Sequence, residues 1–529
     1  MVDTLEVRKS SYVRTAGKLQ RPLTKTIVLQ YLDFLRVRYR DWGWRPCSTT
    51  PHFGPVLPKL HYYYPSGTDT TIASYANRHE PVILPEYQPR LIPGIYRHIR
   101  RFLCHPRVWT RDEYCSSHTT SSKRQFYRDV LERMEETGKI SSTIKPFTKL
   151  EKFNMSKYKA PRCIQARHPS FNIEYGRYLK PLEMLLFHSH REGYHFGKGT
   201  VDQVSANINK LRKKYRYFTE LDHTSWDAHV TVEMLRVSHK FYQSCYNHDR
   251  RLRTLSRKTI RNRCYLRDGG RHTIRGTRMS GDVDTSLGNS ILNYAIIRQV
   301  LEMLGIQGDV IVNGDDSIIF TNVPIPIQQC ERLMKMFNQE SKLKPSTQNI
   351  HTVEYCRTKL IVTAEGETTL LFDPQRSVDM FGMTYQTSIP YQEYLKNVII
   401  CNIAWNRKNP LGAWWKGIFE RTIAKFNAEE TFSKIVNGEI GCEDEYTTAA
   451  LKHDLSDGKW NIASGEPTMS VYQAYPNYDS ALDCGEEMVR RIRKILDVQI
   501  PISTQNPPAH LVATRYVLVN HERKTTLAM

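Results

Sequence analysis

The chain has 529 residues and a formal net charge of +22, because 76 lysines and arginines stand against 54 aspartates and glutamates. This length exceeds what one ordinary hydrophobic core supports, so it predicts several packed subdomains. No run of 18 apolar residues and no apolar N-terminal segment occurs, so we expect neither a transmembrane helix nor a signal peptide in this chain. Eleven cysteines without a CxxC pair are typical of a reducing compartment.

The positive charge is spread along the chain rather than confined to one tail. Basic clusters occur at 96–101, 210–216 and 250–263, and aromatic residues make up 11% of the chain. Such a protein binds a polyanion largely by displacing its counterions, and exposed rings can stack on unpaired bases. A nucleic acid is therefore the expected partner, although a basic enzyme without one would have the same composition.

The N-terminal part contains two weak patterns. Residues 26–38 could form an amphipathic segment on a membrane, although a buried helix is the better interpretation. A set of histidines and cysteines has ligand types that suit zinc, but its spacing is irregular and it has no close cysteine pair. The set comprises His98, Cys104, His105, Cys115 and His118.

A strand-like run at 217–221 is the first element that indicates chemistry. It delivers Asp222 at its end, and a second carboxylate, Asp227, follows five residues later. Taken alone, an acid in this position is more often a helix cap or a solvated surface residue.

Residues 276–305 predict a glycine-containing loop followed by a helix. Asp284 is the expected N-cap, and Gly305 ends the helix after an apolar face with helical spacing. Thr285 and Asn289 are four residues apart, so they share one face of that helix. From there they could reach a ribose hydroxyl or Asp227, although polar residues at this place usually serve as caps.

The string VNGDDSIIF at 312–320 predicts a tight hairpin, because apolar runs flank the turn signal Asn313-Gly314. Asp315 and Asp316 would stand at its tip. Folding gains nothing from two adjacent like charges, but a divalent cation would neutralise both carboxylates. A strand end with one aspartate beside a hairpin tip with two is the arrangement that a two-metal phosphoryl-transfer site requires.

The remaining pattern is mainly helical. Residues 324–344 predict a helix followed by a turn, and tryptophans at 405, 414 and 415 fall in the helical C-terminal part. Residues 461–483 are rich in Pro, Gly, Ser and Tyr, which indicates an irregular linker. We expect the last thirty residues to be poorly ordered.

In order and spacing, three groups of residues resemble motifs A, B and C of viral RNA-dependent RNA polymerases. The strings are similar to those of the tombusvirus-like group of positive-strand RNA viruses. They are Asp222-x4-Asp227, Ser280-Gly281-x3-Thr285-x3-Asn289 and Gly314-Asp315-Asp316. The segment at about 145–172 resembles motif F of the fingers. The motif-level resemblance covers about 145–357.

The resemblance implies a role for each matching residue. Asp222, Asp315 and Asp316 would be the catalytic metal ligands, with Asp316 the weaker one, for two Mg²⁺ or Mn²⁺ ions. Asp227 and Asn289 would read the ribose 2′-hydroxyl, assisted by the Ser280-Gly281 loop and Thr285. Four basic residues would line the tunnel for nucleoside triphosphates, and Arg fits phosphate oxygens with its planar fork. They are Lys149, Lys159, Arg162 and Arg167.

Two further motifs are implied after the hairpin. The string SKLKPS resembles motif D, whose lysine is thought to protonate the leaving pyrophosphate. Lys342 and Lys344 are both candidates, and Lys344 is preferred because Leu343 precedes it as in related strings. Residues 353–361 resemble motif E, with Cys356 at the tip of a strand turn.

The implied fold is an α+β right hand in which an antiparallel palm sheet is backed by helices. Fingers with an N-terminal extension take 1–214, the palm takes 215–375 with a fingers insertion at about 238–275, and a helical thumb and tail take 376–529. The implied partners are single-stranded RNA template, nascent RNA, nucleoside triphosphates and viral or host replication-complex proteins. The implied location is the host cytoplasm at membrane-associated replication complexes, with only indirect membrane attachment.

Two alternatives remain open beside an RNA-directed RNA polymerase. A reverse transcriptase uses the same palm, although Asp227 and Asn289 indicate a pocket that accepts a 2′-hydroxyl. A catalytically inactive RNA-binding scaffold would also be basic, although it has no reason to retain the carboxylates at 222, 315 and 316.

Overall fold

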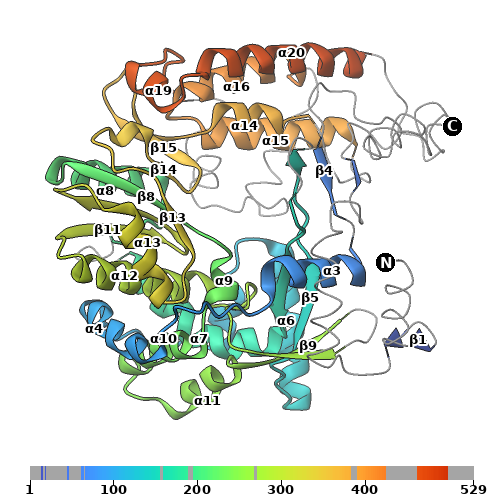
Figure 1. The fold of residues 1–529 in the computed structure, drawn as a ribbon. Helices are drawn as coiled ribbons and strands as arrows, with labels where there is room; N and C mark the ends of the chain where they lie inside the picture. Colours follow the sequence, from blue (N-terminus) through green and yellow to red (C-terminus); the bar gives the residue numbers. More distant parts are fainter. Residues whose placement is uncertain are drawn as a thin grey trace, which may run out of the picture.

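The computed structural model describes residues 61–64, 66–154, 159–188, 195–266, 271–382, 390–424 and 461–497, together with two-residue strands at 14–15, 18–19 and 45–46. The predicted amphipathic segment 26–38 and the last thirty residues lie outside these ranges. In the described part, helices and antiparallel sheets form an α+β fold (Figure 1).

A four-stranded antiparallel sheet forms the centre of the fold. Its strand order is β11-β12-β8-β13, so the hairpin strands are followed by the strand that carries Asp222. The strands are β8 (Tyr217–His223), β11 (Gly308–Asn313), β12 (Asp316–Thr321) and β13 (Ser341–Leu343).

The two faces of this sheet belong to different hydrophobic cores. Val310, Val312 and Ile319 face one core, whereas Ile311, Ile318 and Phe320 face the other, as expected when side chains alternate along a strand. Helices α12 (Thr285–Met303) and α13 (Ile327–Met336) cover the first face. Helix α8 (Val201–Lys214) and a smaller sheet cover the second. Burial on both faces explains why the central strands are continuously apolar.

The hairpin is confirmed, but its turn lies one residue later than the Asn-Gly signal indicates. Asn313 pairs with Asp316 across the ladder, so Gly314 and Asp315 are the two turn residues. Gly314 has φ +59° and its amide donates to the Ser290 hydroxyl at 2.8 Å. Contact with α12 therefore determines where the chain turns.

The motif-bearing helix α12 begins and ends as predicted. Asp284 occupies the N-cap position, Leu304 is the C-cap, and Gly305 follows with φ +67°. The Asp284 side chain does not cap the helix, and its Oδ2 accepts hydrogen bonds from Arg278 and Tyr242 instead. The helix is buried along almost its entire length, so its apolar stripe is wider than one face.

The predicted helix at 324–344 is too long. Helix α13 ends at Met336, and residues 341–343 form strand β13 on the edge of the central sheet. Asn338 has φ +58°, which ends the helix, and the alternation of Ser341, Lys342 and Leu343 (buried, exposed, buried) fits a strand.

A second four-stranded sheet combines residues from two distant parts of the chain. Its order is β10-β9-β5-β7. The strands are β5 (Ile144–Thr148), β7 (Cys163–Arg167), β9 (Arg261–Tyr265) and β10 (Arg271–Arg275). Helix α11 (Arg250–Lys258) contacts this sheet at β9. The other helices of this region pack on one another and on α11, and they are α5 (Arg111–Ser116), α6 (Ser121–Thr137), α7 (Pro169–Phe187) and α10 (Val232–Cys245).

N-terminal to this sheet, short helices lead the chain across the molecule. They are α3 (Thr68–Ser74), a π-helical turn η2 (Tyr75–His79), η3 (Pro89–Ile95), α4 (Tyr96–Ile99) and η4 (Arg100–Phe102). Strand β4 (His61–Tyr63) pairs with β3 (Arg45–Pro46) on one side and with β6 (Phe153–Asn154) on the other. Strand β1 (Arg14–Thr15) pairs with β2 (Lys18–Leu19).

A third sheet joins the central sheet to the C-terminal helices (Figure 1). It consists of β14 (Glu354–Tyr355), β15 (Thr358–Val362) and β16 (Thr368–Phe372). Cys356 and Arg357 form the turn between β14 and β15, with φ +50° and +63°. The predicted strand turn with Cys356 at its tip is therefore present.

The C-terminal part is helical, as expected. Its helices are α14 (Pro374–Asp379), α15 (Tyr391–Trp405), α16 (Pro410–Thr422), α19 (Met469–Ala474) and α20 (Tyr478–Asp497). Helices α19 and α20 correct the prediction of an irregular linker at 461–483, which holds for 461–468 and for the short connection at 475–477. Val471, Tyr475 and Tyr478 are buried in the helical core, so packing overrides the turn-rich composition. No described helix is long and apolar enough to span a membrane.

Candidate active site

A cavity of about 690 Å³ opens where β8 and the β11–β12 hairpin end. Its walls come from the central sheet, from η2, α12 and the short helix α9 (Trp226–His229), and from the segment before β7 and the turn between β14 and β15. The lining residues are Arg78, His79, Arg162, Lys198, His223, Ser225, Trp226, Asp227, Asp282, Val283, Thr285, Ser286, Asn289, Asn313, Gly314, Asp315, Asp316 and Cys356. Motifs A, B and C thus meet at one hollow, as their resemblance implies.

The three principal carboxylates converge at this edge of the sheet. Leu221 pairs with Ser317, so extending the register by one residue sets Asp222 level with Asp316. Asp222 is exposed at the rim and is not among the residues that line the cavity. The strand register places it beside the hairpin tip, and its charge raises the pKa of both Asp315 and Asp316.

The aspartates at the hairpin tip are electrostatically strained. Enclosure by the cavity walls raises the pKa of Asp316 to about 6, and the neighbouring Asp315 raises it further, against a hydrogen bond from the Cys356 thiol that lowers it. Burial is also the largest cause of the raised pKa of Asp315, with Arg162 acting in the opposite direction. A cation placed among these oxygens would remove the mutual repulsion.

Asp227 and Asn289 form a directly bonded pair. The Asn289 amide donates to the Asp227 carboxylate at 2.9 Å, and Arg278 donates to the Asn289 amide oxygen at 3.0 Å. Arg278 is itself held by Asp284 at 2.8 Å, with both side chains buried. Burial raises the pKa of Asp227 to about 6, partly offset by the Asn289 hydrogen bond. The buried ion pair thus fixes which end of the Asn289 amide faces Asp227.

Arg162 enters the cavity from β7's leading loop. Its guanidinium pairs with Glu151, at 2.8 Å for Nε, and its pKa is raised by this carboxylate and further by Asp315 and Asp227. Lys149 lies 3.5 Å from the same Glu151. The pKa of Lys159 is lowered by burial and by neighbouring arginines, so this ammonium belongs to a crowded basic wall.

Arg167 does not line the cavity, contrary to the expectation for it. Its side chain is fully buried and donates to Asp282 at 2.7 and 2.9 Å and to Asn262 at 2.6 Å. A guanidinium at the end of β7 can donate to several acceptors at once, so it holds the loop before α12 against the second sheet.

Ser280 and Gly281 also face β7 rather than the cavity. The Ser280 hydroxyl accepts from the Gln165 amide at 3.1 Å and donates to the Cys163 carbonyl at 3.3 Å. A Cβ on Gly281 would lie 2.6 Å from the Gln165 oxygen. Thr285 does line the cavity, but its hydroxyl donates to the Met279 carbonyl at 2.9 Å.

The two lysines of the motif D string occupy neighbouring positions on one face of the sheet. Lys342 pairs in register with Asp222, whereas Lys344 lies beside Glu220 with its ammonium 2.7 Å from that carboxylate. Glu220 is the largest cause of the raised pKa of Lys344. The register places Lys342 directly opposite Asp222, so both lysines remain candidates.

Several lining residues carry no signal in the motif reading. Arg78 and His79 come from η2, and Lys198 comes from a loop that runs beside β11, where the Gly197 amide donates to the Val312 carbonyl at 2.8 Å. No periodicity marks these positions. Of these four further lining residues, only Cys356 lies in a string that resembles a family motif. Its thiol donates a hydrogen bond to Asp316.

The candidate zinc set is not assembled. Among the described residues, no three His, Cys, Asp or Glu side chains are grouped to hold a metal ion. His98 instead bonds Gln299 at 2.8 Å, Cys115 contacts the Tyr127 carbonyl, and His118 stacks on the Tyr127 ring. The same holds for Asp222, Asp315 and Asp316, which do not by themselves form a closed set of ligands.

Comparison with known proteins agrees with this site. Residues 84–461 match the model of the family described as viral RNA dependent RNA polymerase. Because this match covers well over half of the sequence, the chain belongs to the viral RNA-dependent RNA polymerase family. Its relatives support the tombusvirus-like group within that family, which the motif strings indicate.

Three relatives illustrate the similarity, and each is an RNA-directed RNA polymerase. The one from Maize chlorotic mottle virus is 29% identical over 66% of this chain and 34% of its own length. The one from Tobacco necrosis virus is 28% identical over 75% of this chain and 57% of its own length. The one from Cymbidium ringspot virus is 34% identical over 38% of this chain and 26% of its own length. The chain thus spans between about a third and little more than half of the first two relatives.

Proposed function

We propose that this chain is an RNA-directed RNA polymerase that adds nucleoside monophosphates from NTPs to an RNA 3′ end and releases pyrophosphate. The observation that carries the proposal is that Asp315 and Asp316 line one basic-walled cavity beside the Asp227–Asn289 pair, with Asp222 level with Asp316 at its rim. The proposal also gives the chain the viral partners and replication-complex location that the resemblance implies.

The three carboxylates fit a pair of divalent cations. They supply hard oxygen ligands at the end of rigid strands, and their mutual repulsion would be relieved by positive charge. Magnesium is commonly held by few carboxylates plus phosphate oxygens and water, so an open set suits it, and manganese takes the same ligands. Two ions bound there would activate the attacking hydroxyl and stabilise the leaving oxygen.

The other side chains then have positioning and electrostatic roles. Asp227, oriented by Asn289 and Arg278, is placed to accept a hydrogen bond from a ribose 2′-hydroxyl. Arg162 offers a fork to the triphosphate, for which it would exchange its contact with Glu151. Lys198 and Arg78 add charge to the same wall. Lys342 or Lys344 would give a proton to pyrophosphate. Rate acceleration would come from positioning and charge stabilisation.

The proposal includes a right-hand architecture. The central sheet and the third sheet would form the palm (215–375), and the C-terminal helices α14–α20 the thumb (376–529). The second sheet supports the fingers assignment, because strands before 214 pair there with strands of the insertion at 238–275.

The decisive experiment removes one metal-site carboxylate. We expect Asp315→Ala to abolish template-dependent NTP incorporation while binding of RNA stays within a few-fold of wild type, since Asp315 repels the RNA backbone rather than binding it. Asp483→Ala, an exposed aspartate on α20, is the matched control and should retain full activity. Incorporation is measured with radiolabelled ribo- and deoxynucleotides on a primed RNA. Full activity of Asp315→Ala would overturn the site, and preference for deoxynucleotides would favour a reverse transcriptase.

A further inference from the structure

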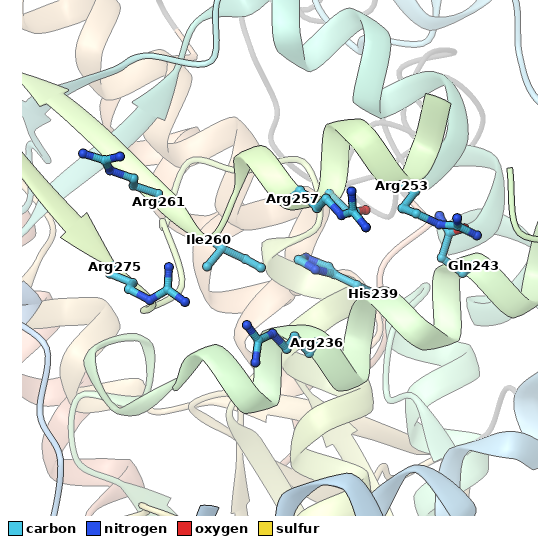
Figure 2. Close-up of a pocket in the computed structure, with 9 residues that line it drawn as sticks. Arg236, His239, Gln243, Arg253, Arg257, Ile260, Arg261 and Arg275 are labelled. Carbon is cyan, nitrogen blue, oxygen red and sulfur yellow. The ribbon is translucent and has the colours of Figure 1, made fainter. Parts of the chain in front are cut away.

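A second hollow lies outside the catalytic cavity, between α10, α11 and the β9–β10 hairpin. It has a volume of about 490 Å³ and shares no residue with the catalytic cavity. Figure 2 shows arginine side chains around it, with His239 and Ile260 between them. Its lining residues are Arg236, His239, Gln243, Arg253, Ser256, Arg257, Ile260, Arg261 and Arg275.

The charge of this hollow is uniformly positive. All five arginines are exposed, and no acidic residue lines it. Arg253 donates to the His248 carbonyl at 3.4 Å. In the part of the chain that the structure describes, the guanidinium groups of the other four have no ion pair. Burial lowers the pKa of His239 to about 4, so at neutral pH the positive charge comes from arginine alone.

The helix pattern explains why these arginines gather on one side. Leu252 and Leu255 of α11 are completely buried, so this short helix can present only its other side to solvent. Arg253 and Arg257 are four residues apart and therefore lie along that side. Folding gains nothing from like charges that repel one another, whereas a bound polyanion would offset the repulsion.

The basic hollow continues into a larger one. A neighbouring hollow of about 1010 Å³ shares Arg257 and Arg261 with it, and no acidic residue lines this one either. It adds four basic residues and the half-exposed ring of Phe126. These basic residues are Arg133, Lys139, Lys258 and Arg263. The two hollows thus adjoin at Arg257 and Arg261, and together they are called the basic groove.

We propose that this basic groove binds the phosphodiester backbone of an RNA strand outside the catalytic cavity. The inference rests on the proposed function, which makes RNA the polyanion at hand. Arginine forks match phosphate oxygens, and the Phe126 ring offers a face on which an unpaired base can stack. An anionic membrane fits less well, because the groove is concave and Phe126 is the one exposed large hydrophobic side chain among the described residues that line it.

The test removes the two arginines that both hollows share. We expect Arg257→Ala/Arg261→Ala to weaken binding of a long single-stranded RNA roughly tenfold at physiological salt. The slope of log K against log salt should fall in magnitude by about 1.4, or about 0.7 for each lost phosphate contact. The loss should be equal for two RNAs of unrelated sequence, because phosphates carry no base information.

Arg493→Ala/Lys494→Ala is the matched control, since it removes two exposed positive charges from α20, outside the basic clusters of the sequence. This control should change the affinity and the salt slope much less. All variants are prepared in the Asp315→Ala background as well as in wild type. The binding result then stands whether or not the chain incorporates nucleotides, so the two proposals fail separately.

Two outcomes would overturn the groove proposal. One is an unchanged salt slope for long RNA in the Arg257/Arg261 variant. The other is a loss of binding to vesicles of anionic phospholipid with RNA affinity intact, which would assign the groove to a membrane surface. An oligonucleotide short enough to fill only the catalytic cavity should bind equally to wild type and to the variant, which would support two separate RNA contacts.

Discussion

His272 lies on β10 with both ring nitrogens inaccessible to solvent, and among the described residues neither has a hydrogen-bond partner. Its ring packs edge-to-face on Tyr75, with centroids 4.7 Å apart. Burial lowers the pKa of His272 from 6.5 to about 4. The folded protein therefore keeps it neutral, whereas the unfolded chain accepts a proton below pH 6.5. Stability is full above that pH and is lost as the pH falls towards 4.

We predict that His272→Phe flattens this acid sensitivity. Phenylalanine keeps the aromatic contact and removes the titrating group, so the variant should lose up to about 3 kcal/mol less stability than wild type between pH 7 and pH 4.5. Denaturant unfolding at a series of pH values measures the difference. His105→Gln, at an exposed histidine, is the control and should leave the pH dependence as it is. Parallel curves for wild type and His272→Phe would contradict the assignment.

The sequence identifies residues whose chemistry folding alone does not favour. Adjacent aspartates at 315 and 316 have no structural benefit, so they could be identified from type and spacing. The role of Arg167 could not be identified in this way. In a basic segment, the sequence does not distinguish a buried arginine that bonds Asp282 from an arginine that lines a cavity. Lys198 was missed for the opposite reason, since only the register beside β11 brings its loop to the site.

At the scale of elements, the loop before α12 depends on close contact with β7. Gly281 has the Gln165 oxygen, the Ala166 Cα and the Gln165 carbonyl carbon within 2.6 to 2.9 Å of where a Cβ would stand. All three are backbone atoms, so they cannot rotate away as a side chain would. The hydroxyl of the neighbouring Ser280 bonds the same strand twice, since it accepts from the Gln165 amide and donates to the Cys163 carbonyl.

We predict that Gly281→Ala displaces this loop from β7. Overpacking against backbone should cost roughly 1–3 kcal/mol in unfolding free energy. It should also lower nucleotide incorporation more than it lowers RNA binding, because Thr285 and Asn289 follow on the same element. Gly94→Ala is the control, since nothing lies within 4 Å of its Cβ position. Wild-type stability and incorporation for Gly281→Ala would show that the contact is not needed.

The sequence pattern predicted elements better than it predicted their ends. Continuous apolar strands around Asp315 and the helix from Asp284 follow directly from hydrophobic pattern and cap residues. The end of α13 did not, because the pattern continues past Met336 while the left-handed Asn338 breaks the helix. Helices α19 and α20 were hidden for a related reason, since their stability comes from packing on α15 and α16 rather than from composition.

At the scale of the whole molecule, contacts between distant segments could not be read from the chain. The second sheet pairs strands near 145 and 265, and no local pattern reports such a partner. The side chain of Asn338 makes contacts of this kind with residues far away in the sequence. Its completely buried side chain donates to the carbonyls of Val82 and His229, each at 2.8 Å, and accepts from the Leu84 amide at 2.7 Å. Asn338 thus links the segment 82–87, which lies between η2 and η3, to His229.

Because Asn338 has φ +58°, glycine can replace it without backbone strain and isolates the role of the side chain. We predict that Asn338→Gly lowers the unfolding free energy by about 3 kcal/mol, or about 1 kcal/mol for each lost hydrogen bond. Asn338→Ala should lower it by about a further 1 kcal/mol, because alanine resists this conformation.

Hydrogen exchange should quicken at Leu84, whose amide loses its acceptor, and at Tyr87, whose amide donates within the same segment. Exchange in β11 and β12 should change only as far as global stability does. If both amides keep their protection in Asn338→Gly, the segment is held by its other contacts, among them the Val82 amide on the Ala228 carbonyl at 3.0 Å.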